Sequence, residues 1–260
     1  YPSSMTKILN AKRFGAGQPL VILHGLFGML DNWQGLAKEF GQFFETHILD
    51  QRNHGKSFHS KEHSYELMCE DLLLYLDKNM IDKIYLLGHS MGGKTAMLFA
   101  CKYPSRVEKL IVVDIGPKYY PPHHQEIIAG LNAVDSANVK SRKQADELLS
   151  EHFTQVGVRQ FLLKNLYWKT SNDLAFRFNL SVLAGEISNV GESLNETYNF
   201  TRPTLFISGE NSNYIVQDDS ILIESHFSDF EIIEIENSGH WVHAEKPKEF
   251  FEVVSRYLIY

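Results

Sequence analysis

Several kinds of feature are scarce or missing in this chain of 260 residues. It has only two cysteines, Cys69 and Cys101, which is too few for a disulfide framework. No apolar run approaches the length of a membrane span, and no basic start followed by an apolar stretch predicts a secretory signal. Net positive charge is also missing: the net charge of −7 argues against a general surface for nucleic acid, although it leaves room for a local basic patch. We therefore expect a cytoplasmic protein with no membrane span and no nucleic-acid partner.

Short apolar runs alternate with helical stretches along the first part of the chain. Residues 20–23, 46–50, 84–87 and 110–114 are the predicted strands, and most of their residues are apolar instead of alternating with polar ones. Alternating strands and helices predict βαβ units and a parallel sheet. Strands without a polar face predict helices on both sides of that sheet. We therefore expect an α/β fold with a mostly parallel central sheet.

The pattern changes in the middle of the chain. Helical stretches dominate over residues 126–134, 141–153 and 158–166, without convincing strands. Strand patterns resume at residues 203–209 and 230–235, ahead of a closing helix.

These shifts predict two parts. Residues 1–116 and 200–260 are expected to form the core, and residues 117–199 a helical cap over the carboxyl edge of its sheet. Residues 1–4 precede Met5 and look like the remnant of an expression tag.

The segment Gly88-His89-Ser90-Met91-Gly92 follows one apolar run and leads into a helix-forming stretch. This is the G-x-S-x-G pattern in a strand–turn–helix context, where a serine is forced onto a sharp turn with its hydroxyl exposed. The flanking glycines remove Cβ atoms that would clash as the chain doubles back. The pattern indicates that Ser90 is a nucleophile.

A serine nucleophile needs a base, which in turn needs an acid to orient it. His240 lies in a loop directly after the last strand, as expected for the base in the chain order serine, acid, histidine. His243 is the nearest competitor and is expected to pack locally.

The acid is less obvious from the sequence. The loop after residues 203–209 lacks the expected aspartate, and Ser212 occupies about its place. Asp218 and Asp219 lie further along. Asp114 ends the preceding strand at the edge where ligand chemistry gathers in such sheets. We favour Asp114 as the acid, with Ser212 able to add a hydrogen bond to the histidine.

An oxyanion needs two backbone donors. One is expected from the N–H of Met91, after the nucleophile, and the other from the N–H of Leu26, in the loop that follows residues 20–23. His24 is expected to brace that loop, and Asp50 and Arg52 to pin loops to each other.

Other features carry less weight. His123-His124 and the group His54, His59 and His63 suggest a metal, but no H-E-x-x-H pattern exists, so we expect none. Five cap aromatics are expected to form the cap's own core rather than an acyl pocket; they are Phe161, Tyr167, Trp168, Phe176 and Phe178.

Taken together, these residues resemble the α/β-hydrolases, and most of all the bacterial YbfF-type esterases. The resemblance rests on the motifs His24-Gly25-x-x-Gly28, Asp50-x-Arg52-x-His54-Gly55, Gly88 to Gly93 and Gly239-His240-Trp241. It implies an α/β-hydrolase fold, a triad of Ser90, Asp114 and His240, and no cofactor. It also implies hydrolysis of a small-molecule carboxylic ester or acyl thioester, acyl-CoA included.

Two rival functions stay open. A carbon–carbon bond hydrolase or lyase can share the same fold and triad. A protein of a different class, a catalytically silent binding protein of this fold, usually loses the serine or the histidine, and this chain keeps both.

Overall fold

The computed structural model describes residues 7–260, so the possible tag remnant at residues 1–4 lies outside the described part. Its main sheet has seven strands in the order β1-β3-β2-β4-β5-β8-β9. All neighbouring pairs are parallel except β1 with β3. The strands are β1 (Ala11–Phe14), β2 (Pro19–Leu23), β3 (Glu45–Leu49), β4 (Ile84–His89), β5 (Val107–Val113), β8 (Thr204–Gly209) and β9 (Phe230–Ile235).

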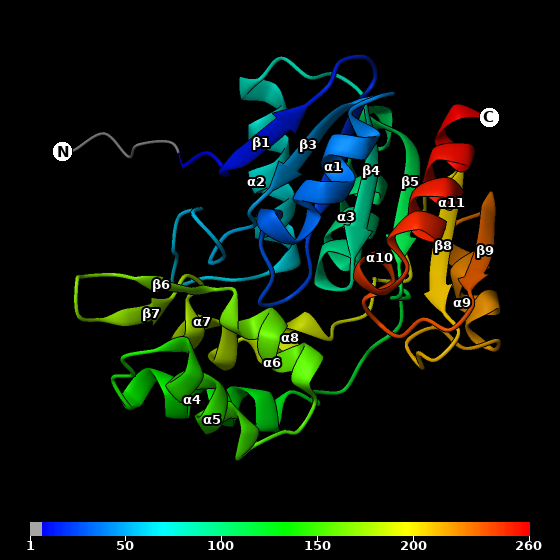
Figure 1. Ribbon diagram of the computed structural model, residues 1–260. Coiled ribbons are helices and arrows are strands. Elements are labelled where there is room, and N and C mark those ends of the chain that lie inside the picture. The colour runs from blue at the N-terminus through cyan, green and yellow to red at the C-terminus, as the bar shows by residue number, and fades with distance from the viewer. Residues whose placement is uncertain (1–6) are drawn as a thin grey trace.

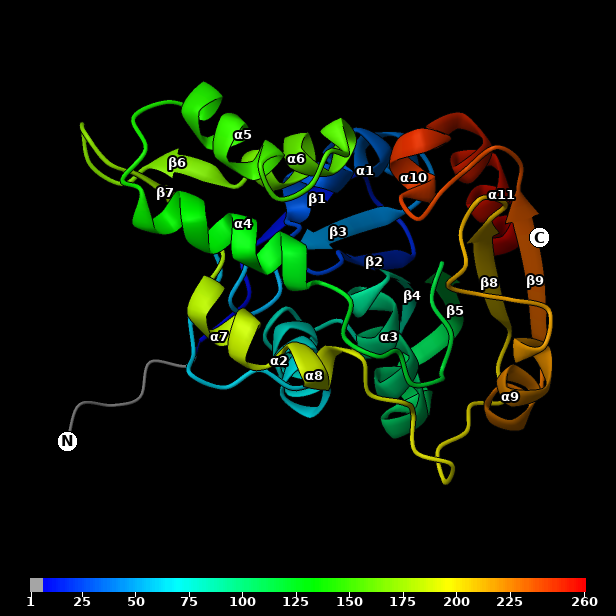
Figure 2. The ribbon, with the colours of Figure 1, turned by 90° about the horizontal axis from the view of Figure 1, so that it is seen from below.

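Helices cover both faces of this sheet (Figures 1 and 2). Successive residues of one strand enter opposite cores: Leu20 and Ile22 pack with α1 and α11, whereas Val21 and Leu23 pack with α2 and α3. The core helices are α1 (Gln34–Phe40), α2 (Tyr65–Lys78), α3 (Met91–Lys102), α9 (Asp219–His226), α10 (Val242–Glu245) and α11 (Pro247–Ile259). The parallel sheet between two helical layers is therefore confirmed.

Strand β1 is the one part of the sheet that the sequence pattern did not indicate. It lies at the edge, antiparallel to β3, and its residues Lys12 and Arg13 are exposed. An edge strand that faces solvent does not need a run of apolar residues. The apolar pattern that indicated the other strands is therefore absent from β1.

Residues 117–199, which we call the cap, lie between β5 and β8 in the sequence and beyond the carboxyl ends of the parallel strands in space (Figure 1). The cap has its own apolar core, to which Phe27 of the main domain contributes. Its elements are α4 (Gln125–Ser136), α5 (Arg142–Ser150), α6 (Val156–Leu163), β6 (Leu166–Trp168), β7 (Leu174–Phe176), α7 (Leu180–Gly185) and α8 (Ile187–Val190).

The expectation that the cap holds no strands was wrong. The helix expected over residues 158–166 ends at Leu163, and Leu166 begins the antiparallel hairpin β6–β7. Asn165 explains the break, because its side-chain amide donates to the carbonyl oxygens of Leu162 (3.1 Å) and Phe27 (2.8 Å). Asparagine competes with the helical backbone in this way and favours turns.

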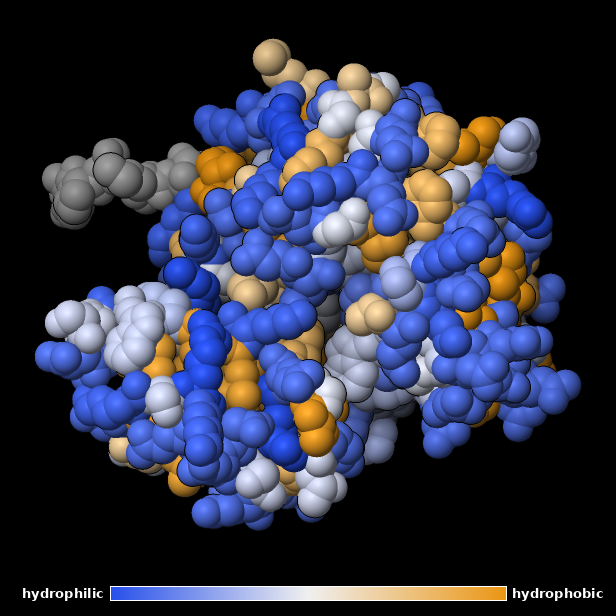
Figure 3. All heavy atoms as spheres, in the orientation of Figure 1, coloured by the Kyte–Doolittle hydropathy of each residue, from blue (hydrophilic) through white to orange (hydrophobic). Residues whose placement is uncertain are grey.

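On the face in Figure 3, hydrophilic side chains cover most of the core and the cap, and hydrophobic ones are exposed in small groups. Among residues 7–260 no helix has both the length and the apolar character that a bilayer crossing needs.

Candidate active site

Ser90 occupies the sharp turn between β4 and α3. Its φ is +55°, an unfavourable value for a residue with a side chain. A Cβ on Gly88 would lie 2.1 Å from the carbonyl oxygen of Gly92, and a Cβ on Gly92 would lie 2.3 Å from that of Leu23. Only glycine fits these close approaches, so the flanking glycines allow the turn that raises Ser90 above the sheet.

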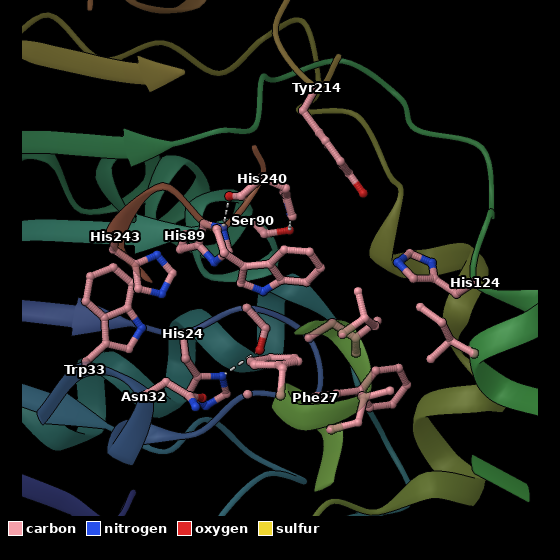
Figure 4. A pocket seen from close by; sticks show the side chains of 18 of the residues that line it. His24, Phe27, Asn32, Trp33, His89, Ser90, His124, Tyr214, His240 and His243 are labelled. Carbon is pink, nitrogen blue, oxygen red and sulfur yellow. Dashed lines mark hydrogen bonds between the residues drawn. The ribbon is translucent and has the colours of Figure 1, made fainter. Parts of the chain in front are cut away.

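His240 lies beside Ser90, on the loop between β9 and α10 (Figure 4). Its Nε2 is 3.0 Å from Ser90 Oγ, and its Nδ1 is 2.7 Å from Asp114 Oδ2. With Nδ1 donating to the carboxylate, Nε2 is left to accept the serine proton. The three side chains thus form one continuous hydrogen-bonded chain.

Asp114 directly follows β5 and is fully buried, with 0% of its surface exposed. Its φ is +53°, and its backbone N–H donates to Ile207 on β8 at 2.7 Å. Oδ1 accepts the N–H of Gly209 at 3.0 Å, while Oδ2 accepts from both His240 and Ser212. Three donors thus hold the carboxylate in one orientation toward His240.

Ser212 lies in the expected place but contacts a different partner. Its hydroxyl donates to Asp114 and forms no hydrogen bond to His240, so any support reaches the histidine through the carboxylate. The alternative acids lie elsewhere: Asp219 pairs with Lys118 at 2.8 Å, and Asp218 is exposed.

Two more histidines border His240. His89 Nε2 donates to the His240 carbonyl oxygen at 2.8 Å, and His243 stacks on Trp33 with ring centroids 3.8 Å apart. Burial lowers the pKa of His89 well below its usual range and that of His243 to about 3. Both rings therefore stay neutral near pH 7. Because a low pKa makes an imidazole a weak base, neither ring competes with His240 for the serine proton.

The loop of residues 24–28 abuts Ser90, because a Cβ on Gly25 would lie 3.3 Å from the serine Cβ. Two buried imidazoles hold the loop. His24 donates from Nδ1 to Gly25 and accepts the Gln51 N–H at Nε2, whereas His54 accepts the Phe27 N–H at Nε2.

The two expected oxyanion donors border the serine. Leu26 and Met91 both line a small hollow of about 30 Å³ that Ser90 also lines. Within residues 7–260 neither backbone N–H has a hydrogen-bond acceptor. Both donors are thus available to an oxygen atom bound beside the serine.

Asp50 and Arg52 support loops rather than the reacting atoms. Asp50 accepts the N–H groups of Leu30 and Lys56, and Arg52 makes a buried bidentate pair with Asp71 at 2.7 and 2.9 Å. This agrees with the structural role expected for both.

A cavity of about 260 Å³ opens above Ser90 between the core and the cap (Figure 4). Its apolar lining comes from Leu26, Phe27, Ile127, Val158, Phe161, Leu162 and Trp241. Of the cap aromatics, Phe161 lines this cavity, Phe176 and Phe178 are buried in the cap core, and Trp168 is exposed. The cavity suits an apolar group attached to the atom that Ser90 attacks.

Three residues in this cavity were not expected to belong to the site. Tyr214 stacks on His240, and its hydroxyl donates to His123 Nε2 at 2.6 Å. His124 extends from the cap into the cavity (Figure 4), and its Nδ1 is buried without a partner among the described residues. Burial lowers its pKa to about 4, so the ring is neutral near pH 7. In the sequence, nothing distinguishes these residues from ordinary loop residues.

No three His, Cys, Asp or Glu side chains within residues 7–260 are grouped so as to hold a metal ion. The histidine pair at residues 123–124 instead contacts Tyr214 and the cavity.

Comparisons with known proteins identify the family of this chain. A family model described as alpha/beta hydrolase fold matches residues 18–247. The chain is 36% identical to the Escherichia coli esterase YbfF over 241 residues, which cover 92% of each protein. It is 39% identical to the Mus musculus sn-1-specific diacylglycerol lipase ABHD11 over 247 residues, covering 92% of this chain and 80% of that one.

A solved structure extends the likeness to three dimensions. A marine microorganism esterase, 37% identical in sequence, matches with a TM-score of 0.93 and covers 97% of this chain and 100% of its own. These relatives support hydrolysis of a small-molecule ester and confirm the resemblance to YbfF-type esterases. The chain belongs to the α/β-hydrolase fold family.

Proposed function

We propose that this protein is a serine hydrolase that cleaves carboxylic esters or acyl thioesters through an acyl-enzyme intermediate. The observation that carries the proposal is the hydrogen-bonded chain from Ser90 through His240 to Asp114 at the floor of an apolar cavity. The proposal includes the division into a core, residues 1–116 and 200–260, and a cap, residues 117–199, that shapes the acyl pocket.

Acylation begins when Ser90 Oγ attacks the substrate carbonyl carbon and its proton passes to His240 Nε2. Asp114 holds the imidazole by Nδ1 and stabilises the imidazolium that forms. The N–H groups of Leu26 and Met91 bind the oxygen that becomes negative, and each such donor contributes about a hundredfold or more in rate. Collapse of the tetrahedral intermediate expels the alcohol or thiol, which takes the proton from His240.

Deacylation repeats the sequence with water. His240 removes a proton from a water molecule as its oxygen attacks the acyl carbon, and the same two N–H groups stabilise the new oxyanion. Ser90 leaves with the proton returned by His240, and the carboxylic acid is released.

The size of the cavity limits the length of the acyl group that can enter it. Its volume of about 260 Å³ lies below the range of roughly 300–1,000 Å³ that holds drug-sized ligands. A short or medium acyl chain therefore fits best inside, with the leaving group, an acyl-CoA thiol included, directed outward. The cytoplasmic location expected from the sequence stays a prediction.

Labelling tests the nucleophile. A fluorophosphonate probe is expected to modify the wild-type protein, and Ser90→Ala to abolish both labelling and turnover, lowering kcat by at least about a thousandfold. A folded wild-type protein that resists the probe would instead favour the silent binding protein.

A substrate panel tests the reaction. We expect turnover of p-nitrophenyl esters or acyl-CoAs, with the preferred chain length at the short end of a C2 to C16 series. Labelling without turnover of any ester or thioester would favour a carbon–carbon bond hydrolase or lyase.

A further inference from the structure

The aromatic ring of Tyr214 covers one face of the His240 imidazole. The two ring centroids are 3.9 Å apart and the planes differ by 19°, so the rings are stacked. His89 and Trp241 approach the same imidazole at larger angles of 43° and 74°. Tyr214 is therefore the group that lies flat against the ring that must carry the proton.

Hydrogen bonds fix Tyr214 at its backbone and at its hydroxyl. Its N–H donates to Ser212 Oγ at 3.3 Å, and its carbonyl oxygen accepts from the Tyr120 hydroxyl. Its own hydroxyl donates to His123 Nε2, because His123 Nδ1 donates to the Pro121 carbonyl oxygen. The ring thus has little freedom to move away from His240.

These anchors connect the catalytic loop to the cap. Tyr120 and His123 lie in the segment that leads from β5 to α4, the first helix of the cap. The Tyr120 hydroxyl also accepts the N–H of Gly116, two residues after Asp114. The acid, the stacked ring and the start of the cap are therefore tied by one set of hydrogen bonds.

We propose that Tyr214 is a positioning residue that holds the His240 imidazole in line with Ser90 and stabilises its protonated form through the aromatic face. This role rests on the proposed serine hydrolase mechanism, in which His240 becomes an imidazolium during both half-reactions. An aromatic face attracts a cation placed over it, and the attraction grows when water is excluded.

The other groups that face His240 do not supply this stabilisation, apart from Asp114 on the edge of the ring. The Glu245 carboxylate accepts the backbone N–H groups of Gly239 and Trp241, on either side of His240. Among the residues described, the titratable rings near His240 are His89 from β4, His243 from α10 and His124 from the cap. Burial lowers the pKa of all three, so near pH 7 each presents a neutral ring.

The test replaces the ring while keeping the site covered. Tyr214→Leu keeps an apolar side chain over His240 but removes the aromatic face. Tyr214→Phe keeps the face and loses only the bond to His123. Tyr119→Leu, at an exposed tyrosine of the segment that leads from β5 to α4, is the matched control.

Tyr214→Leu is expected to lower kcat/KM by about threefold to thirtyfold and the pKa of His240 by about 0.5 to 1.5 units. Tyr214→Phe keeps the aromatic face, so the pKa of His240 is expected to stay close to its wild-type value. Tyr119→Leu is expected to match the wild type in both kcat/KM and this pKa. The pKa is read from the pH profile of kcat/KM and, independently of turnover, from NMR titration of the His240 ring.

The two readouts separate the possible failures. An unchanged His240 pKa in folded Tyr214→Leu overturns the proposal, even if activity falls, because a merely structural role would lower activity without moving that pKa. A wild-type protein that turns over no substrate contradicts the proposed function, while the NMR titration still decides whether Tyr214 stabilises the imidazolium.

Discussion

At the scale of single residues, the two groups that flank His240 are held in unfavourable backbone conformations. Ser90 and Asp114 both have positive φ, which costs roughly 1–3 kcal/mol for a residue with a side chain. The sheet imposes these conformations, because the Ser90 N–H donates to Val113 and the Asp114 N–H donates to Ile207. Strain at both residues places their side chains above the ends of neighbouring strands, within reach of one histidine.

The assignment of Asp114 as the acid can be tested by a substitution that keeps the shape of its side chain. Asp114→Asn is expected to lower kcat about ten-thousandfold, because an amide no longer holds His240 in the tautomer that accepts at Nε2. Ser212→Ala removes one hydrogen bond from the carboxylate and is expected to lower kcat less than a hundredfold. Steady-state kinetics on one ester compares them, and near-normal turnover in Asp114→Asn would contradict the assignment.

At the scale of elements, loops and helices that touch no substrate hold the site in place. The loop after β3 supplies His54, which accepts the Phe27 N–H and so shapes the loop beside Ser90. Arg52 ties the same loop to α2 through its buried pair with Asp71. Burial raises the pKa of Asp71, and the bonds to Arg52 act in the opposite direction.

Breaking this pair is expected to destabilise the protein more than replacing it. Arg52→Met leaves the Asp71 carboxylate buried without its partner and is expected to lower the free energy of unfolding by about 3 kcal/mol or more. The double variant Arg52→Met with Asp71→Leu is expected to recover most of that loss, because neither charge remains.

Urea denaturation of the wild type, both single variants and the double variant measures the coupling. Additive losses in the double variant would show that the pair does not act as a unit.

At the scale of the whole molecule, a single buried lysine joins the nucleophile helix to both connections of the cap. Lys94 Nζ, four residues after Ser90, donates to the carbonyl oxygens of Lys118 and Glu192. The two connections also bond to each other, from the Tyr120 N–H to Gly191 at 2.8 Å. Burial lowers the pKa of Lys94 to about 7. The cap is therefore fastened within a few residues of the site that it covers.

Removing this lysine is expected to loosen the cap connections. Lys94→Met leaves two carbonyl oxygens without their donor, so the amides of residues 118–120 and 190–194 are expected to exchange with solvent faster, by about tenfold or more. Hydrogen exchange read by mass spectrometry measures this. Lys102→Met, on the same helix, is the control, and equal exchange in both variants would contradict the expectation.

The sequence by itself determined what depends on neighbours along the chain. Apolar runs and glycine spacing indicated the parallel sheet, the turn at Ser90 and the loop of His240, because strands, turns and helices follow from local sterics and burial. It did not indicate β1, whose residues Lys12 and Arg13 are exposed, or the cap hairpin, which begins where Asn165 ends the helix expected there.

Only the tertiary structure decided which distant residues meet. Asp114, Ser212 and His240 come together because β8 lies between β5 and β9, and no local pattern in the sequence specifies that strand order. The same holds for Tyr214, which stacks on His240 from a loop 26 residues earlier and is anchored by the cap. Strand ends and chain order indicated Asp114 and His240. Tyr214 carries no such signature, because a contact between remote segments depends on how whole elements pack.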